Sequence, residues 1–150
     1  MGMRALLGAI SLIAGAPGLS GCSDERREER LRAAGAEPEL ADLLRVADPA
    51  IGQRKFGRCS ACHTIGAGGP NLAGPNLAGI YGKGLAQGSP RFGYTAALLA
   101  AAGQNQRWDA ATLDAWLADP KALVPGTSMR FEGVADPLDR ADIIAFLRSS

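Results

Sequence analysis

Histidine is almost absent from this chain of 150 residues, which contains one histidine, three cysteines and three methionines. A structural zinc site takes four ligands, usually cysteine and histidine. The available side chains are Cys22, Cys59, Cys62 and His63, so such a site would have to recruit a cysteine from the distant N-terminus. The shortage also excludes a metal held by two histidines of the same chain.

Aromatic residues are few as well, at 5% of the chain, and all of them follow residue 50. Residues 22–49 lack aromatics and carry five arginines against eight aspartates and glutamates, a net charge of −3. Such a composition cannot bury much of its own surface. We therefore expect residues 22–49 to form a charged, flexible tether with one short helix near Leu40 and Leu44. Residues 50–150 carry ten basic against seven acidic residues, net +3, and form the expected domain.

The chain has no apolar run long enough to cross a bilayer as a helix. Its longest such run, residues 5–16, follows Arg4 and is typical of an export signal. Residues 19–22 read Leu-Ser-Gly-Cys and resemble the lipobox of bacterial lipoproteins. We expect residues 1–21 to be a signal peptide and Cys22 to be lipidated, which would anchor the protein to a membrane. An ordinary cleaved signal, which leaves Cys22 as a free thiol, and an uncleaved anchor are the alternatives.

The sequence Cys-Ser-Ala-Cys-His at residues 59–63 is the C-x-x-C-H pattern that attaches c-type haem. Both thiols can form thioethers to one porphyrin, and the histidine that follows then supplies the proximal ligand of the iron. A dithiol oxidoreductase would place its C-x-x-C near a strand-helix-strand pattern, and no alternating apolar run precedes Cys59. The motif predicts one covalently bound haem c, attached at Cys59 and Cys62, with its iron bound by His63.

Met129 is the candidate for the opposite side of the iron, because the other two methionines lie in the expected signal peptide. It follows Pro125 and Gly126, which favour an extended turn over a helix. A loop of this kind can carry a thioether across a haem face. The alternative is a methionine that fills a gap in the core, but a lone methionine after Pro-Gly is poorly placed for a helical core stripe.

Together these motifs resemble the class I cytochromes c, and the resemblance extends over residues 50–150. It implies that Pro75, in a loop reading Gly-Pro-Asn-Leu-Ala-Gly, accepts the proton of the His63 imidazole through its carbonyl. Pro70 lies in a preceding copy of Gly-Pro-Asn-Leu-Ala and is the alternative, but the family's spacing from the first cysteine selects Pro75. The resemblance further implies that Tyr94 and Trp108 hydrogen-bond the haem propionates, and that Gly52 and Phe56 pack against Phe146.

The family consists of small electron carriers, so the resemblance implies a monohaem carrier that is not an enzyme and takes no small-molecule substrate. Its expected location is the periplasmic side of a bacterial cell envelope. A cytochrome bc complex is the implied electron donor and a haem-copper oxidase the implied acceptor. Two alternatives are a haem peroxidase or gas sensor in which Met129 is labile, and a fixed cytochrome subunit of a periplasmic dehydrogenase. The scattered basic residues carry no nucleic-acid signature.

Helix signals predict an all-α fold in which several helices and glycine-rich loops wrap around the haem. Aspartates at 48, 109 and 136 are candidate helix N-caps, and two of them precede a proline. The second of these helices is expected to stop at Asp119, before Pro120, and the third to run to the C-terminus. An alanine-rich helix is expected from about residue 95 to Gly103. No strand pattern competes with these helices.

Overall fold

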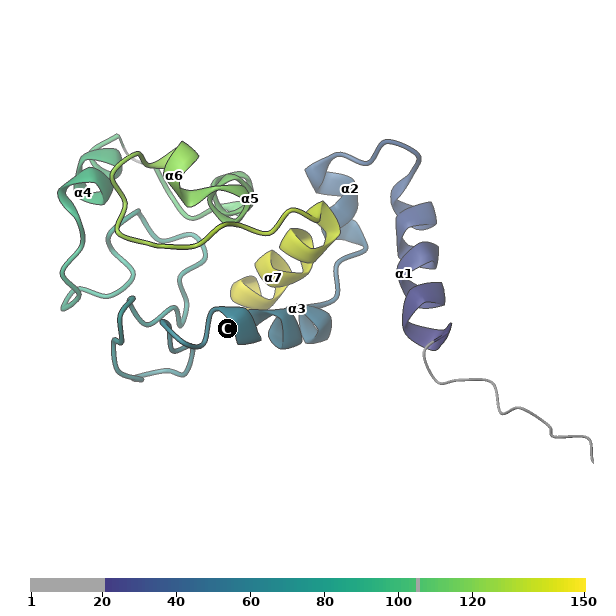
Figure 1. Ribbon diagram of the computed structural model, residues 1–150, viewed down its shortest axis with the longest axis horizontal. Coiled ribbons are helices and arrows are strands. Elements are labelled where there is room, and N and C mark those ends of the chain that lie inside the picture. Colours follow the sequence, from purple (N-terminus) through teal and green to yellow (C-terminus); the bar gives the residue numbers. More distant parts are fainter. Residues whose placement is uncertain (1–20, 105) are drawn as a thin grey trace, which may run out of the picture.

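Helices are the main elements of the computed structural model, which describes residues 21–104 and 106–150, with side chains from Asp24 onward (Figure 1). The one pairing of β type among these residues is an isolated bridge between Gly84 and Arg107. The prediction of an all-α fold is therefore confirmed. The helices are α1 (Gly21–Ala34), α2 (Leu40–Arg45), α3 (Pro49–Lys55), the 3-10 helix η1 (Phe56–Arg58), α4 (Ala96–Ala102), α5 (Ala110–Ala118), α6 (Pro120–Leu123) and α7 (Pro137–Ser149).

Aspartate side chains start three of these helices as the sequence predicted. Asp48, Asp109 and Asp136 each accept hydrogen bonds from backbone N–H groups of the first turn of α3, α5 and α7. Helix α6 was not predicted. Asp119 ends α5, but its side chain also accepts from the N–H groups of Lys121 and Ala122, so the same Asp-Pro pair begins a further short helix.

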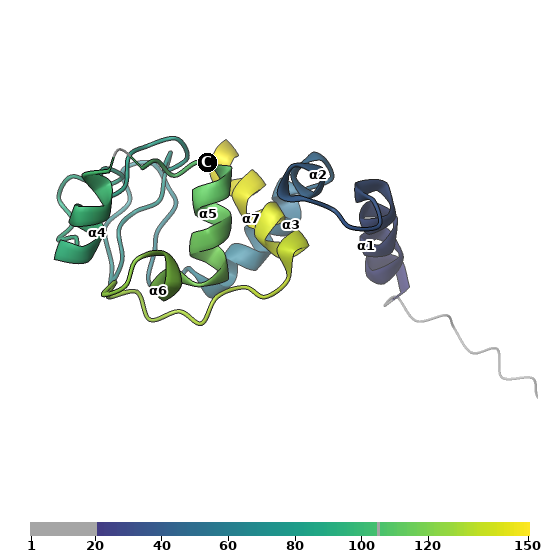
Figure 2. The same ribbon diagram turned by 90° about the horizontal axis from the view of Figure 1, so that it is seen from above.

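The crossing of α3 and α7 is the main helix contact of the domain, and the two lie side by side in Figures 1 and 2. A Cβ atom on Gly52 would lie 2.0 Å from the carbonyl oxygen of Asp142, so only glycine allows this approach. One turn further along, Phe56 meets Phe146 edge to face, with 5.5 Å between the ring centroids. The packing expected for Gly52, Phe56 and Phe146 is present.

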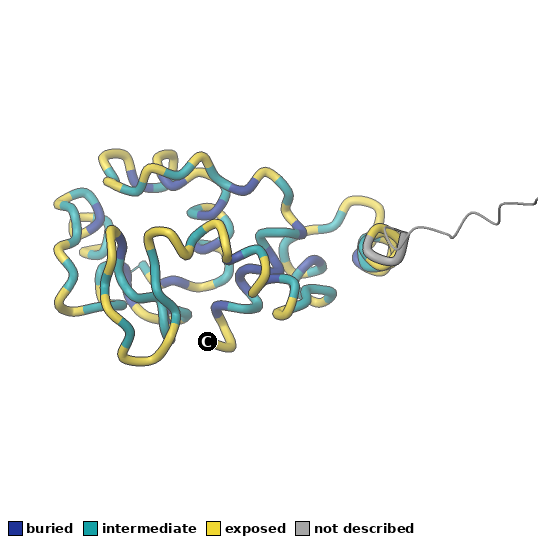
Figure 3. The backbone as a smooth tube through the Cα atoms, turned by 60° about the horizontal axis from the view of Figure 1, so that its bottom comes forward, coloured by how far each residue is buried: buried dark blue, intermediate teal, exposed yellow. Residues whose placement is uncertain are grey.

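Long loops make up most of the chain between η1 and α4. Buried residues gather in the helices near the C-terminus, whereas the loops are mostly exposed or half-buried (Figure 3). Gly74 is the only buried residue from 57 to 79, all of which the structure describes. Backbone hydrogen bonds such as those from Gly74 to Cys62 and from Leu77 to Thr64 link the parts of this segment.

The segment expected to be a flexible tether is instead largely helical in the structure. Helices α1 and α2 fold back toward the start of α7, where Ala34 and Leu43 pack with Leu138 and Ala141 (Figure 2). Helix α1 is rich in arginine and glutamate, which have good intrinsic helix propensity. Its composition is that of a disordered segment, but two of its arginines form ion pairs with residues far away in the sequence.

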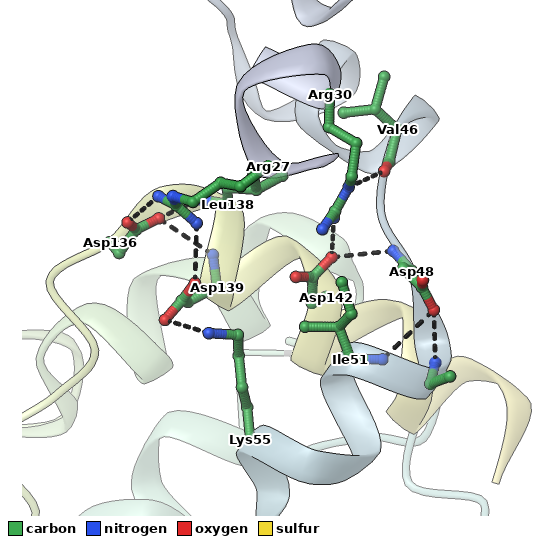
Figure 4. A network of polar contacts seen from close by, with 11 residues as sticks. Arg27, Arg30, Val46, Asp48, Ile51, Lys55, Asp136, Leu138, Asp139 and Asp142 are labelled. Atoms are coloured by element: carbon green, nitrogen blue, oxygen red, sulfur yellow. Dashed lines mark hydrogen bonds and ion pairs between the residues drawn. The ribbon is translucent and has the colours of Figure 1, made fainter. Parts of the chain in front are cut away.

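Those partners are three aspartates at the N-terminal end of α7 (Figure 4). Arg27 pairs with Asp136 and Asp139, and Arg30 pairs with Asp142 and donates a 2.8 Å hydrogen bond to the carbonyl of Val46. The arrangement stabilises α1 against α7 because acidic groups at a helix N-terminus and the arginines that face them attract each other.

Asp142 is the most deeply buried member of this network, with no exposed surface. Its Oδ1 accepts from Arg30 and from the backbone N–H of Asp48 at 2.8 Å, while Oδ2 has no hydrogen-bond partner among the described residues. Arg30 is thus the cation that compensates a carboxylate inside the α3–α7 crossing. The N-terminal arm, residues 24–47, is in this sense part of the domain.

The predicted signal peptide lies almost wholly in residues 1–20, outside the described part of the chain, and so does the side chain of Cys22. Among the described helices, none is both long enough and apolar enough to cross a membrane.

We predict that Arg30→Ala lowers the free energy of unfolding by about 3–5 kcal/mol, because it leaves the Asp142 carboxylate buried without its cation. Arg27→Ala is the matched control. The side chains of Arg27 and Asp136 are 36% and 38% exposed, and an ion pair of that kind contributes about 1 kcal/mol or less. Denaturant unfolding of the haem-loaded protein measures both values, and similar small losses for the two variants would contradict the assigned role of Arg30.

Candidate haem-binding site

Helix α3 and the 3-10 turn that follows it deliver the C-x-x-C-H segment to the surface of the domain. The turn continues without a break, since the N–H of Cys59 donates to the carbonyl of Phe56 at 2.7 Å and the N–H of His63 to that of Cys59 at 3.0 Å. Cys59 is half-buried and Cys62 exposed, and neither forms a disulfide. Burial raises the pKa of the Cys59 thiol, against a smaller opposing effect of Arg58.

The His63 imidazole is oriented by a backbone carbonyl. Its Nδ1 lies 2.8 Å from the carbonyl oxygen of Pro75, which fixes the tautomer with the proton on Nδ1. The structure places Pro75 here and gives Pro70 a different neighbour, because the Pro70 carbonyl accepts from the Thr64 hydroxyl at 2.7 Å. The remaining ring nitrogen, Nε2, makes no hydrogen bond to a described residue and has a lone pair for a metal.

Gly74 forms one wall of the imidazole site. A Cβ atom at this position would lie 2.3 Å from Cε1 of His63 and 2.8 Å from Nε2, so a larger residue would push the ring away. Backbone hydrogen bonds hold the wall in place, from Gly74 to Cys62 and from Leu77 to Thr64, both at 2.8 Å. The proximal loop is thus tied to the C-x-x-C-H segment on both sides of His63.

Met129 lies on a different segment, the loop between α6 and α7, which passes close to α4 (Figure 1). It is half-buried, and its N–H donates to the Thr127 hydroxyl at 3.3 Å. Gly126 has φ +90°, and a Cβ there would lie 3.3 Å from Cβ of Ala97 in α4. The turn predicted from Pro125 and Gly126 is present and brings this loop against α4.

Tyr94 and Trp108, the residues expected near the propionates, lie on two loops of the same region. The Tyr94 hydroxyl accepts from the N–H of Ser89 at 2.8 Å, and burial raises its pKa. Trp108 is buried and packs edge to face on Trp116 with 5.3 Å between ring centroids. Both belong to the main apolar cluster, which would present a large nonpolar wall to a porphyrin.

Sequence reasoning missed the polar side chains that hold the proximal loop. Asn76 donates to the Thr64 hydroxyl at 2.6 Å and to the Gly66 carbonyl at 2.8 Å, and Asn71 accepts from two neighbours. The available signal was the tandem repeat, in which both asparagines occupy the same position.

These residues fit a haem c. Two thiols follow a helical turn, the imidazole is oriented with Nε2 available, and the cradle at Gly74 leaves room for the ring and nothing more. A metal ion held only by protein side chains fits this site less well than haem c does. No cluster of three or more His, Cys, Asp or Glu occurs among residues whose placement is described.

Comparison with known proteins identifies the family. The Cytochrome c family model matches residues 49–150. A cytochrome c homolog of Bradyrhizobium diazoefficiens is 38% identical over 123 residues, covering 82% of this chain and 65% of that relative. Cytochrome c2 of Rhodomicrobium vannielii is 40% identical over 107 residues, covering 71% of this chain and 82% of the relative. Among solved structures, cytochrome cH from Methylobacterium extorquens matches with TM-score 0.64 and 39% identity, over 69% of this chain and all of that structure.

The chain therefore belongs to the cytochrome c family. Membership implies one covalently bound haem c with its iron and the all-α cytochrome c fold, in agreement with the helices and the site. The relatives include cytochromes c2 and cH of bacteria, which supports a monohaem electron carrier.

We predict that Gly74→Ala displaces His63 and lowers the free energy of unfolding of the haem-loaded protein by about 1–3 kcal/mol, the usual cost of overpacking. Gly66→Ala is the control, since a Cβ there meets nothing within 4 Å. Denaturant unfolding and the yield of haem protein measure the effect. Equal yields and stabilities for the two variants would mean that the ring does not depend on this wall.

Proposed function

We propose that this protein is a membrane-tethered, periplasmic monohaem cytochrome c that relays single electrons between membrane-bound redox complexes. The observation that carries the proposal is the oriented His63 imidazole, whose Nδ1 is held by Pro75 so that Nε2 is free. Met129 supplies a second, softer ligand from a separate loop. With both His63 and Met129 as ligands, the iron would have no open position, which favours an electron carrier over a peroxidase or gas sensor.

The roles of the chain's own residues follow from their chemistry. Cys59 and Cys62 would hold the haem through thioethers, and His63 and Met129 would hold its iron. When bound, haem c supplies an iron that alternates between the ferric and ferrous states. The Met129 thioether favours the ferrous state. The Pro75 carbonyl makes His63 more basic, and a more basic imidazole favours the ferric state. The apolar cluster around Trp108 keeps water from the site.

Charge on the domain supports docking to acidic partners. Arg58, Lys83, Lys121 and Arg130 are all exposed, and from the resemblance to the family we expect them near the haem edge. Basic groups around an electron-transfer site steer acidic partners and lose this effect at high salt. A cytochrome bc complex as donor and a haem-copper oxidase as acceptor are the partners that the family suggests.

Anchoring through a lipidated Cys22 rests on the Leu-Ser-Gly-Cys ending of the leader. If Cys22 is the anchor, only a few residues separate it from Arg27, which already pairs with α7. The domain would then stay close to the membrane, because most of the expected tether is docked. Helix α4, next to the Met129 loop, lies at the opposite end of the long axis from α1 (Figures 1 and 2).

Met129→Ala tests the ligand set. We expect the variant to keep covalent haem, to lose the weak far-red band of ferric iron bound to sulfur, and to show a lower reduction potential. The ferrous form should also bind CO, because a position on the iron becomes open. Absorption spectra and potentiometry measure these changes. An unaltered spectrum and potential would show that Met129 is not the ligand and would favour the sensor or peroxidase alternative.

Cys22→Ser tests the anchor independently of the haem. The variant should either fail to mature or move from the membrane to the soluble fraction, while its spectrum and potential stay those of the parent, since no ligand lies in this segment. Ser23→Ala, which keeps the cysteine, is the matched control. Mass spectrometry of the mature N-terminus gives the direct measurement, and an unmodified Cys22 in the parent would reject the lipid anchor.

A further inference from the structure

The tandem repeat Gly-Pro-Asn-Leu-Ala at residues 69–73 and 74–78 binds two consecutive residues, the last residue of the C-x-x-C-H segment and the threonine that follows it, through the same backbone group. The carbonyl of Pro70, in the first copy, accepts from the side chain of Thr64 at 2.7 Å. The carbonyl of Pro75, in the second copy, accepts from the ring of His63 at 2.8 Å. Only the second copy contacts a candidate iron ligand, so the role of the first copy has to be explained separately.

The asparagine of the first copy holds the second. The Oδ1 atom of Asn71 accepts from the backbone N–H of Asn76 at 2.9 Å. That N–H belongs to the same peptide group as the Pro75 carbonyl, and the described part of the chain has no cis peptide bond. The two polar groups of one trans peptide therefore point in opposite directions, one to Asn71 and the other to His63.

Hydrogen bonds on the two sides of an amide strengthen each other. An acceptor at the N–H shifts electron density toward the carbonyl oxygen, so the oxygen becomes a better acceptor. The contacts form a chain from Asn71 through the peptide to Nδ1 of His63. A stronger acceptor at Nδ1 makes the imidazole more basic toward a metal at Nε2.

A second loop fixes the position of Asn71. The Ser89 hydroxyl donates to the same Oδ1 at 2.9 Å, and the Ser89 N–H donates to the Tyr94 hydroxyl at 2.8 Å. Asn71 therefore contacts the proximal loop and the Tyr94 loop at once. Its side chain is half-buried, which shields these hydrogen bonds in part from water.

We propose that Asn71 is a positioning residue that sets the basicity of His63 through the peptide between Pro75 and Asn76, and so lowers the reduction potential of the protein. The proposal rests on His63 being the proximal iron ligand. A more basic imidazole favours ferric iron, so a protein without the Asn71 acceptor should be easier to reduce.

The test uses the full-length, haem-loaded protein and two readouts. In Asn71→Ala, the reduction potential should shift upward, and the NMR resonance of the His63 Nδ1 proton in the ferrous state should shift upfield, because its hydrogen bond is weaker. Asn71→Asp keeps an oxygen acceptor at the position and should hold the potential at or below that of the parent, with the proton resonance unmoved or further downfield.

Ser89→Ala is the matched control, because it removes the other hydrogen bond of Asn71 and leaves the one to Asn76 in place. It should loosen the contact between the loops but keep the potential and the proton resonance. Equal upward shifts in Asn71→Ala and Ser89→Ala would show general loosening and overturn the proposal, as would no shift in Asn71→Ala. If Asn71→Ala retains no haem, Asn71→Asp and Ser89→Ala are compared with the parent instead. The proposal predicts that the reduction potential of Asn71→Asp is equal to or lower than that of the parent, and that the potential of Ser89→Ala is unchanged.

Failure of the proposed function has a different signature. If His63 were not an iron ligand, the Nδ1 resonance could still respond to Asn71 while the potential stayed constant in every variant.

Discussion

The close crossing of α3 and α7 is the contact on which the rest of the structure depends. It requires glycine at position 52, where a Cβ would lie 2.0 Å from the Asp142 carbonyl oxygen. Helix α3 continues directly into η1 and the C-x-x-C-H turn, so the position of this crossing determines where both cysteines and His63 are presented. The side chain of Asp142 is buried beside the crossing and draws Arg30 of α1 to it. Haem attachment and the N-terminal arm are therefore fixed by the same helix pair.

Much of the fold could be predicted because its signals are local. An aspartate followed by proline is a local signal that favours a helix start. The starts at Asp48 and Asp136 were accordingly visible in the sequence, whereas Asp119 was interpreted only as the end of α5. The structure of residues 24–34 was not. A segment of arginine and glutamate without aromatics has the composition of a disordered chain, and its ordering depends on Arg27 and Arg30 meeting aspartates more than a hundred positions away. Such long-range ion pairs cannot be predicted from amino-acid composition.

The site divides in the same way. Cys59, Cys62 and His63 lie within five residues of one another, and this C-x-x-C-H pattern predicts a covalent haem without knowledge of the surrounding fold. The family's spacing selected Pro75 over Pro70 from the sequence, and in the structure the Pro75 carbonyl faces the imidazole. The structure also showed the contacts of Asn71, whose hydrogen-bond partners lie on two different loops. Residues that act through a shared peptide group leave no motif of their own.

The central claim is that one haem c is covalently attached and that its iron is bound by a histidine and a methionine of this chain. Absorption spectra of the purified full-length protein, recorded in both oxidation states, test that claim most directly. The account predicts the sharp low-spin bands of haem c in the ferrous state and the weak far-red band of iron bound to sulfur in the ferric state. A high-spin spectrum in either state, or haem that separates from the polypeptide on denaturation, would contradict it.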